Sequence, residues 1–325
     1  MIPIRDTIQS RSYPVVNTAI IVVNVLVYFF QLSKGTGMEL TRFFLIYGLV
    51  PARYTVPELG RYFSTDQQLF SFLSFMFLHG GFWHLLGNMW SLYIFGDNVE
   101  DRLGPIRYML FYLLCGIASG LTQLAVNHTS QVPTIGASGA IAGIMGAYFV
   151  LYPKSRILTL IPIFFIPYFV EIPAYFFLGI WFLMQFMSGL GSHLQASGVA
   201  WWAHIGGFVA GVLLLMLLKK VPQTGVSGRL RAVSPERPTH RLQVIGTTSR
   251  VDDHNLYGVI RVTPREARFG TRKLVNIPWG GQKRLFNVRI PEGVTEETVL
   301  RLAGMGRRKG ANQAGDLLLK VLIES

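Results

Sequence analysis

Long apolar stretches dominate the sequence up to Leu218 and leave few folds open to the chain. A helix that crosses a bilayer needs about 20 mostly apolar residues. Six stretches approach or reach that length: 15–33, 82–99, 106–126, 137–152, 173–191 and 200–218. Half of the residues are hydrophobic and only 14% are charged, which is too apolar for an ordinary soluble domain. The sequence therefore predicts a polytopic α-helical membrane bundle with six transmembrane helices.

Three of the six stretches are short and carry polar residues, which predicts helices buried inside the bundle. The segment 157–171, before the fifth stretch, contains Pro162 and Pro167, and we expect an irregular interfacial loop there. Pro173 would then lie in the first turn of the fifth helix, where a missing N–H costs little.

The distribution of Lys and Arg orients these helices. Six spans put both termini on one side, and Lys219, Lys220 and the basic tail predict that this side is the cytoplasm. The inner loops add four cations: Arg102, Arg107, Lys154 and Arg156. The outer loop 34–81 opposes the bias, but long loops follow the rule poorly. We expect a multi-pass protein of a bacterial inner membrane without a cleavable signal peptide, because the first residues are polar.

After Pro222 the chain becomes polar and basic. Residues 223–325 hold 18 Lys and Arg against 9 Asp and Glu, so they carry +9 of the formal +13. The segment 222–253, rich in Pro, Gly, Ser and Arg, is typical of a flexible linker attracted to anionic lipid. From 254 to 325, the runs LYGVIRV, RLFNVRI and DLLLKVLIE predict a small all-β domain, with a helical or turn element at VTPREARFG. The basic residues are dispersed, so we expect no nucleic acid partner.

Three predicted helices that run from outside to inside carry polar residues at a similar depth. His79, His84 and Asn88 lie near the start of the second, Ser138 begins the fourth, and His204 lies early in the sixth. Each has an ordinary explanation alone, because a lone serine usually bonds its own helix and a lone histidine can be a packing residue. Their convergence at one depth favours a functional site.

Glycines provide a way for the fourth and sixth helices to meet. Several are spaced so that they share a helix face: Gly139, Gly143 and Gly146 on the fourth, and Gly207 and Gly211 on the sixth. Small residues at this spacing let helix backbones approach closely in lipid, although simple packing would use the same contact. If these faces pack together, Ser138 and His204 come within hydrogen-bond reach.

A serine hydroxyl is a weak nucleophile until a base removes its proton, and His204 can be that base for Ser138. We expect a Ser–His dyad, because no carboxylate lies near enough in sequence and Glu171 falls in the loop expected on the opposite side. The Ser138 backbone N–H, the Asn88 amide and the His84 ring can donate hydrogen bonds to a developing oxyanion.

These residues resemble the rhomboid family of intramembrane serine proteases. The similarity covers roughly residues 10–220 and rests on motifs in a fixed order: His79, His84 and Asn88, then EDRLG (100–104), Gly136-Ala137-Ser138-Gly139, and Ala203-His204-Ile205-Gly206-Gly207. The resemblance implies a six-helix core, a water-filled cavity open to the outer side, and cleavage of membrane-anchored proteins within or beside a transmembrane helix. It implies no metal or cofactor, and Cys115, the only cysteine, allows no internal disulfide.

The same resemblance implies roles for further residues. Gly136, Gly139 and Gly207 would support the site, as would His79, and residues 173–199 would form a lateral gate and cap. One position departs from the pattern, because some members carry an aromatic residue one turn after the serine that stacks on the histidine. Ala142 occupies that position here, which leaves the orientation of His204 open.

Residues 255–324 resemble a C-terminal peptide-binding β-domain of DnaJ-type co-chaperones. The resemblance rests on VTPREARFGT, VRIPEGV, RLAGMGRR and GDLLLKV. The His-Pro-Asp motif of a J domain and the cysteine-rich zinc module are absent from the sequence, so stimulation of an Hsp70-type ATPase is not expected. Binding of unfolded peptide segments and a role in folding or assembly alone stay equally open.

Two functions fit these observations. One is an intramembrane serine endopeptidase with transmembrane protein substrates, and the other is a non-proteolytic membrane adaptor or chaperone that binds transmembrane helices. A transporter is disfavoured, because neither an inverted repeat nor paired ionisable residues are evident. Inactive relatives of rhomboids usually lack the serine or the histidine, and the presence of both favours the protease.

Overall fold

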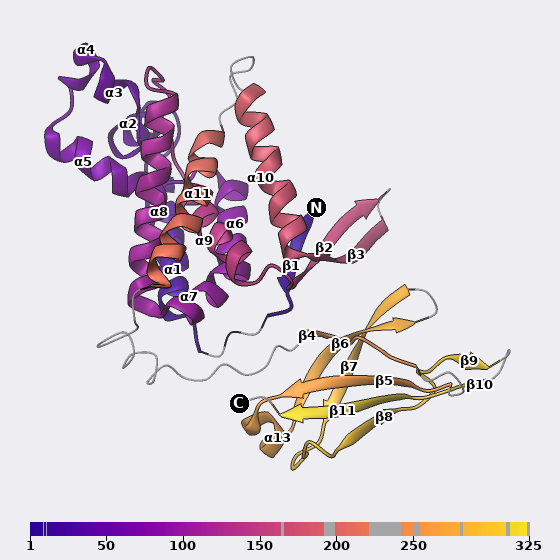
Figure 1. Ribbon diagram of the computed structural model, residues 1–325. Coiled ribbons are helices and arrows are strands. Elements are labelled where there is room, and N and C mark those ends of the chain that lie inside the picture. Colours follow the sequence, from indigo (N-terminus) through magenta and orange to yellow (C-terminus); the bar gives the residue numbers. More distant parts are fainter. Residues whose placement is uncertain are drawn as a thin grey trace. The chain divides into compact units, whose positions relative to one another are not determined.

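The computed structural model describes residues 1–8, 10, 12–163, 166–191, 199–220, 242–249, 254–279, 282–309 and 313–323. The chain divides into two compact units, Met1–Pro235 and Glu236–Ser325. Most of the first unit is helical and most of the second consists of strands (Figure 1). Each unit is therefore described by itself.

Helices cover the six predicted apolar stretches. They are α1 (Val15–Leu32), α6 (Phe82–Ser91) continued by the π-helical turn η2 (Leu92–Gly96) and α7 (Asp97–Leu103), α8 (Pro105–Val126), α9 (Ser138–Leu151), α10 (Ala174–Gly191) and α11 (Trp201–Leu218). Four of them, α1, α8, α10 and α11, are long and apolar enough to cross a membrane. The segments Thr65–Phe77 and Phe82–Leu103, bent by 79° at their junction, make a fifth candidate if they count as one span. The described residues thus hold four or five candidate spans.

Helix α9, the stretch expected to be the fourth span, lies in the middle of the helical unit (Figure 1). It has only 14 residues, about 21 Å at 1.5 Å per residue. Every residue from Gly139 to Tyr148 is buried. A helix that is apolar on all sides is stable where other helices surround it, so α9 is the core helix of this unit.

Glycines bring α9 and α11 together. A Cβ atom added to Gly207 would collide with the backbone carbonyl of Gly139, and one added to Gly211 would collide with that of Gly143. The predicted small-residue faces therefore pack against each other, backbone against backbone.

The outer helices of this unit turn large apolar side chains outward. Examples are Phe29 and Phe30 on α1, Leu183 and Met187 on α10, and Leu213 and Leu217 on α11, all more than half exposed. Such faces suit contact with lipid acyl chains, where apolar side chains need no cover.

Residues 34–81 fold into short helices at one side of the unit (Figure 1): α2 (Met38–Tyr47), α3 (Ala52–Thr55), α4 (Pro57–Gly60), α5 (Thr65–Ser74) and the 3₁₀ turn η1 (Phe75–Phe77). Arg53 is buried, and its guanidinium donates to the carbonyls of Leu45, Ile46 and Gly48 at 3.1, 3.2 and 3.0 Å. Carbonyls at the C-terminal end of a helix lack partners within it. Arg53, one of the outer-loop cations that oppose the orientation rule, therefore stabilises the end of α2.

The EDRLG motif holds the start of α1. The Glu100 carboxylate accepts hydrogen bonds from the backbone N–H groups of Val16 at 3.0 Å and Asn17 at 2.7 Å. Asp101 accepts from the N–H and the hydroxyl of Ser12 at 3.1 and 2.6 Å. Because the first N–H groups of a helix have no partner within it, Glu100 caps α1 from α7, and Asp101 holds the segment that precedes α1.

The predicted irregular loop at 157–171 is wrong, because a β-hairpin occupies this segment. Strand β2 (Arg156–Ile163) pairs with β3 (Ile166–Pro173) on one side and with β1 (Ile2–Asp6) on the other. Pro162 pairs with Pro167 in the register of β2 and β3, past Leu160, where the pairing with β1 ends. A proline at that point removes no hydrogen bond to β1, so the strand tolerates it.

The second unit contains two three-stranded sheets, β4-β6-β7 and β5-β11-β8, and the pair β9-β10. The strands are β4 (Leu242–Val244), β5 (Leu256–Val262), β6 (Thr271–Trp279), β7 (Gln282–Ile290), β8 (Val299–Leu302), β9 (Arg308–Lys309), β10 (Gln313–Ala314) and β11 (Leu317–Ile323), and helix α13 (Pro264–Phe269) joins β5 to β6. The three predicted strand runs and the predicted helical element are therefore confirmed.

Alternate residues of the strands form the core of this unit, including Ile260, Val275, Val288 and Leu319. One charge is buried beside them: the Lys273 ammonium is unexposed and bonds the Glu266 carboxylate at 2.5 Å. Glu266 also completes a capping box with Thr263 at the start of α13. The ion pair therefore ties α13 to β6.

Strand β4 lies within 222–253, the segment for which the sequence predicts a flexible linker. It pairs in parallel with β6, and the Gln243 amide exchanges hydrogen bonds of 2.6 and 2.9 Å with the backbone of Arg261. Ile245, directly after the strand, is buried in the core. This part of the segment thus belongs to the β unit, and residues 221–241 and 250–253 lie outside the described residues.

Candidate active site

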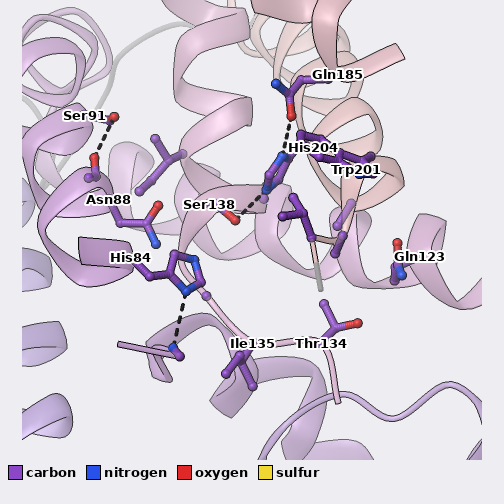
Figure 2. A pocket seen from close by; sticks show the side chains of 18 of the residues that line it. His84, Asn88, Ser91, Gln123, Thr134, Ile135, Ser138, Gln185, Trp201 and His204 are labelled. Atoms are coloured by element: carbon purple, nitrogen blue, oxygen red, sulfur yellow. Dashed lines mark hydrogen bonds between the residues drawn. The ribbon is translucent and has the colours of Figure 1, made fainter. Parts of the chain in front are cut away.

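A cavity of about 940 Å³ opens within the helical unit and is lined by four of the five polar residues that the sequence singled out. Ser138 from α9, His204 from α11, and His84 and Asn88 from α6 all line it (Figure 2). Glu171 does not line it; this residue lies on β3, where its carboxylate is 3.8 Å from the Arg156 guanidinium. The two helices that meet through glycines therefore contribute the hydroxyl and one of the imidazoles.

Ser138 and His204 are joined by a hydrogen bond. The distance between the serine Oγ and the imidazole Nε2 is 2.7 Å, and both side chains are half-buried (Figure 2). Ser138 is the first residue of α9, so its backbone N–H has no acceptor within the helix. The hydroxyl therefore has a base beside it and an unused donor on its own backbone.

The loop that leads into α9 depends on a glycine. Gly136 has a φ of +126°, in the region that residues with a side chain rarely adopt. A Cβ there would also lie 2.8 Å from Cε1 and Nε2 of His84. Gly136 thus lets the His84 ring pack against the backbone two residues before Ser138.

Hydrogen bonding fixes where His84 carries its proton. Its Nδ1 accepts from the Gly80 backbone N–H at 3.3 Å, which places the proton of the neutral ring on Nε2. That Nε2–H is the atom beside Gly136. His84 can therefore donate a hydrogen bond toward the cavity.

Asn88 and His79 differ in their relation to the cavity. The Asn88 side chain is buried, lines the cavity, and has an Nδ2 without a hydrogen-bond partner among the described residues. A buried amide donor without a partner is unusual and fits a group kept for a ligand. His79 is fully buried and does not line the cavity; its ring packs edge-on against His84 with centroids 5.2 Å apart.

Gln185 also lies at the site, although no sequence pattern predicted its contact with His204. Its Oε1 lies 2.7 Å from Nδ1 of His204, on the side of the ring opposite Ser138 (Figure 2). The available signal was a single amide in the apolar run WFLMQFM of the fifth predicted span. A polar group within a membrane helix indicates a functional site, and this holds for Gln185 as it does for His204.

Tryptophans pack against His204 where Ala142 leaves no aromatic ring. Trp181 on α10 has its ring centroid 6.1 Å from that of His204, with the planes 31° apart. Trp201 on α11 lies at 6.3 Å and is nearly perpendicular to the imidazole, at 86°. The imidazole is therefore flanked by aromatic rings from α10 and α11, while α9 contributes only the small Ala142.

The described parts of the chain contain no group of three His, Cys, Asp or Glu side chains that could hold a metal ion. Cys115 is buried as a free thiol in α8. The functional groups of the cavity are thus hydroxyls, imidazoles and amides. This set suits acyl transfer by a nucleophile and a base.

Known protein families match two parts of the chain. Residues 66–221 match the family model of the rhomboid domain, and residues 248–325 match that of the DnaJ C terminal domain. Rhomboid protein 1, mitochondrial, from Saccharomyces cerevisiae is 28% identical over 171 residues, which cover 50% of this chain and 45% of the yeast protein. RHOMBOID-like protein 6, mitochondrial, from Arabidopsis thaliana is 30% identical over 184 residues, 54% of each chain.

A further relative is named as inactive. Inactive RHOMBOID-like protein 8 from Arabidopsis thaliana is 30% identical over 103 residues, 30% of this chain and 29% of the plant protein. This chain spans about half the length of the first two relatives it matches. Similarity of sequence therefore does not by itself decide between an active and an inactive protein, and the side chains of the cavity carry the argument.

Proposed function

We propose that this chain, which carries a rhomboid domain followed by a DnaJ C-terminal domain, is an intramembrane serine endopeptidase. Its substrates are membrane-anchored proteins, cleaved within or beside a transmembrane segment. The observation that carries the proposal is the 2.7 Å hydrogen bond between Ser138 Oγ and His204 Nε2 inside a cavity of the helical unit. A packing serine has no use for such a base, because it can bond its own helix backbone.

Hydrolysis would proceed in two steps at these groups. His204 Nε2 takes the hydroxyl proton while Ser138 Oγ attacks the carbonyl carbon of the scissile peptide, and the imidazolium then protonates the leaving amine. This gives an acyl-enzyme on Ser138. A water molecule, deprotonated by the same Nε2, next attacks the ester and releases the acid product and the free hydroxyl.

Three donors are available to the oxyanion that forms in each step. They are the Ser138 backbone N–H, the unpartnered Nδ2 of Asn88 and the Nε2–H of His84. Each donor of this kind typically contributes about 3 kcal/mol to stabilisation of the transition state. We assign His79 a supporting role, because it packs behind His84 and does not reach the cavity.

The form of the substrate follows from the chemistry. A helix engages its peptide carbonyls in its own hydrogen bonds, so the attacked segment must be extended. Transmembrane segments weakened by Gly, Pro or polar residues are the preferred substrates. We propose six spans, with α9 as the short central one, both termini in the cytoplasm, and the cavity open to the outer side of a bacterial inner membrane. Residues 173–199 would act as gate and cap, of which 192–198 lie outside the described residues.

The β unit would act on the cytoplasmic side of the same membrane. Its match to a DnaJ C-terminal domain supports the binding of unfolded peptide segments. The sequence offers no His-Pro-Asp motif, so we propose peptide capture without stimulation of an Hsp70-type ATPase. The basic residues of 222–241, before β4, would keep this unit close to anionic lipid.

Reconstitution into liposomes with a single-span model substrate tests the proposal. We expect wild-type protein to cleave it, and Ser138→Ala and His204→Ala to lose more than about 1000-fold in rate, because the nucleophile or its base is gone. A fluorophosphonate probe should label Ser138 only while His204 is intact. Cleavage at the wild-type rate by both variants would rule out the dyad, and binding without cleavage by the wild type would favour the membrane adaptor.

A further inference from the structure

The hydrogen bond between Gln185 and His204 adds a third side chain to the Ser–His pair. Gln185 lies on α10, Ser138 on α9 and His204 on α11, so each group comes from a different helix. The Gln185 side chain is only 7% exposed. Its Oε1 and the serine Oγ lie on opposite sides of the imidazole, each 2.7 Å from a ring nitrogen (Figure 2).

The amide oxygen of Gln185 determines which nitrogen of the His204 ring carries the proton. An amide oxygen can only accept a hydrogen bond, so Nδ1 of His204 must carry the proton that it receives. In the neutral ring, Nε2 then keeps its lone pair and faces the hydroxyl of Ser138. The opposite tautomer would present an N–H to Ser138 and could not take its proton.

We propose that Gln185 is a positioning residue that fixes the tautomer and the ring orientation of His204 for the reaction with Ser138. This inference rests on the proposed protease function. Gln185 takes the place that a carboxylate or an asparagine has in other hydrolase triads, with an uncharged acceptor suited to a site between membrane helices. It also makes the competent site depend on the packing of α10 against α11.

The surroundings of Gln185 support positioning over simple packing. Trp181 lies one turn earlier on the same helix and packs against the same imidazole. α10 therefore contacts His204 in two ways. The Trp181 ring limits the tilt of the imidazole, and the Gln185 amide determines which ring nitrogen carries the proton. Met184, the neighbour of Gln185, is instead about half exposed on the outer surface.

Three variants of the full chain separate these roles. Gln185→Met removes the acceptor and keeps a side chain of similar length, Gln185→Glu keeps an acceptor and adds charge, and Leu213→Met, on the exposed face of α11 and outside the proposed gate, is the control. All three are assayed in proteoliposomes with the fluorogenic single-span substrate, over a range of pH.

We expect Gln185→Met to lower kcat by about 10- to 100-fold with KM changed less than about twofold, because the base is misoriented while the cavity is intact. Gln185→Glu should recover most of that loss, and the acid limb of its pH–rate profile should move to higher pH, because a carboxylate stabilises the imidazolium. Leu213→Met should match the wild type. A kcat of Gln185→Met within twofold of wild type would overturn the proposal, as would a Gln185→Glu variant with equally low kcat and an unmoved acid limb.

A measurement without turnover keeps this inference separate from the proposed function. ¹⁵N NMR of histidine-labelled protein in micelles, assigned against His204→Ala, reports which ring nitrogen carries the proton. We expect the Nδ1–H form of His204 in the wild type and a mixture of both tautomers in Gln185→Met. An unchanged spectrum would overturn the role of Gln185 even in an active protease, whereas cleavage at the wild-type rate by Ser138→Ala would remove the Ser–His assignment and leave the tautomer measurement as it stands.

Discussion

The helical unit and the β unit bury polar side chains against different kinds of partner. In the helical unit, several such side chains bond backbone groups of other segments, as Arg53 does with the end of α2 and Gln31 does with both backbone groups of His79. In the β unit, the Lys273 ammonium pairs with the side chain of Glu266 within one local motif. In lipid no water is available for the ends of helices, so side chains must satisfy them from within the protein.

The two units also build their cores differently. β-Branched and leucine side chains fill the interior of the β unit. In the helical unit, the closest contact runs between main chains of α9 and α11, at glycines. A substitution in the β unit should therefore lower its stability by removing an interaction partner. A substitution at a glycine between α9 and α11 should lower the stability of the helical unit by adding volume.

The largest expected effect tests the ion pair of the β unit. Lys273→Ala removes the buried ammonium that pairs with the Glu266 carboxylate and should cost about 3–5 kcal/mol of stability. Hydrogen exchange measured by mass spectrometry on the full chain should show faster exchange in β6 and β7. The matched control is Lys320→Ala on β11, an exposed residue for which a change within about 0.5 kcal/mol is expected. Equal effects of both variants would contradict the assignment of Lys273.

A smaller effect tests the glycine contact of the helical unit. The methyl group of Gly207→Ala would push against the carbonyl of Gly139 and should cost about 1–3 kcal/mol. Cleavage of the model substrate should fall by about 100-fold, because a displacement near 1 Å misaligns the hydroxyl and the imidazole. Gly179→Ala on α10 is the control, since its Cβ would meet nothing within 4 Å. Wild-type cleavage by Gly207→Ala would argue against main-chain packing as the determinant of the site.

The smallest effect concerns Asp6, a buried carboxylate at the end of β1. Burial raises the pKa of Asp6 well above its usual range, and the nearby Asp97 carboxylate adds to the shift, while the hydrogen bond from the Tyr148 hydroxyl opposes it. A raised pKa in the folded state means that stability is full below the unfolded pKa of about 3.9 and is lost as pH rises through the folded value.

Asp6→Asn removes this pH dependence and keeps an oxygen for the Tyr148 hydroxyl and the Asn98 amide. The free energy of unfolding of Asp6→Asn minus that of the wild type should therefore be more positive at pH 8 than at pH 5, by an amount on the order of 1 kcal/mol. Tryptophan fluorescence in detergent measures it. A constant difference across this range would mean that Asp6 does not titrate on unfolding.

Sequence patterns predicted the parts of the fold that follow from local composition. Apolar runs located the helices, because burial in lipid or in a bundle requires them, and β-rich runs between turns located β5, β7 and β11. The glycines at four-residue spacing predicted the contact of α9 with α11. They therefore also predicted that Ser138 and His204 would lie within hydrogen-bond reach.

What the sequence did not reveal depends on partners far along the chain. The prolines in 157–171 indicated a loop. The pairing of β1 with β2 ends at Leu160, before Pro162, so the proline costs β2 no hydrogen bond to β1. Arg53 is one of the outer-loop cations that oppose the orientation rule, and its sequence position does not show that it bonds backbone carbonyls at the end of α2. Gln185 lies on another helix than His204, and no spacing in the sequence relates its amide to that ring, so its contact with His204 was not predicted.

The absence of side chains between Gly139 and Gly207 has a consequence for handling the protein. No acyl chain or detergent molecule can enter between two main chains that already touch. Exchange of lipid for detergent should thus alter the outward faces of α1, α10 and α11 first. The spacing of Ser138 and His204 is set by covalently rigid peptide groups, so it should survive solubilisation that loosens the periphery.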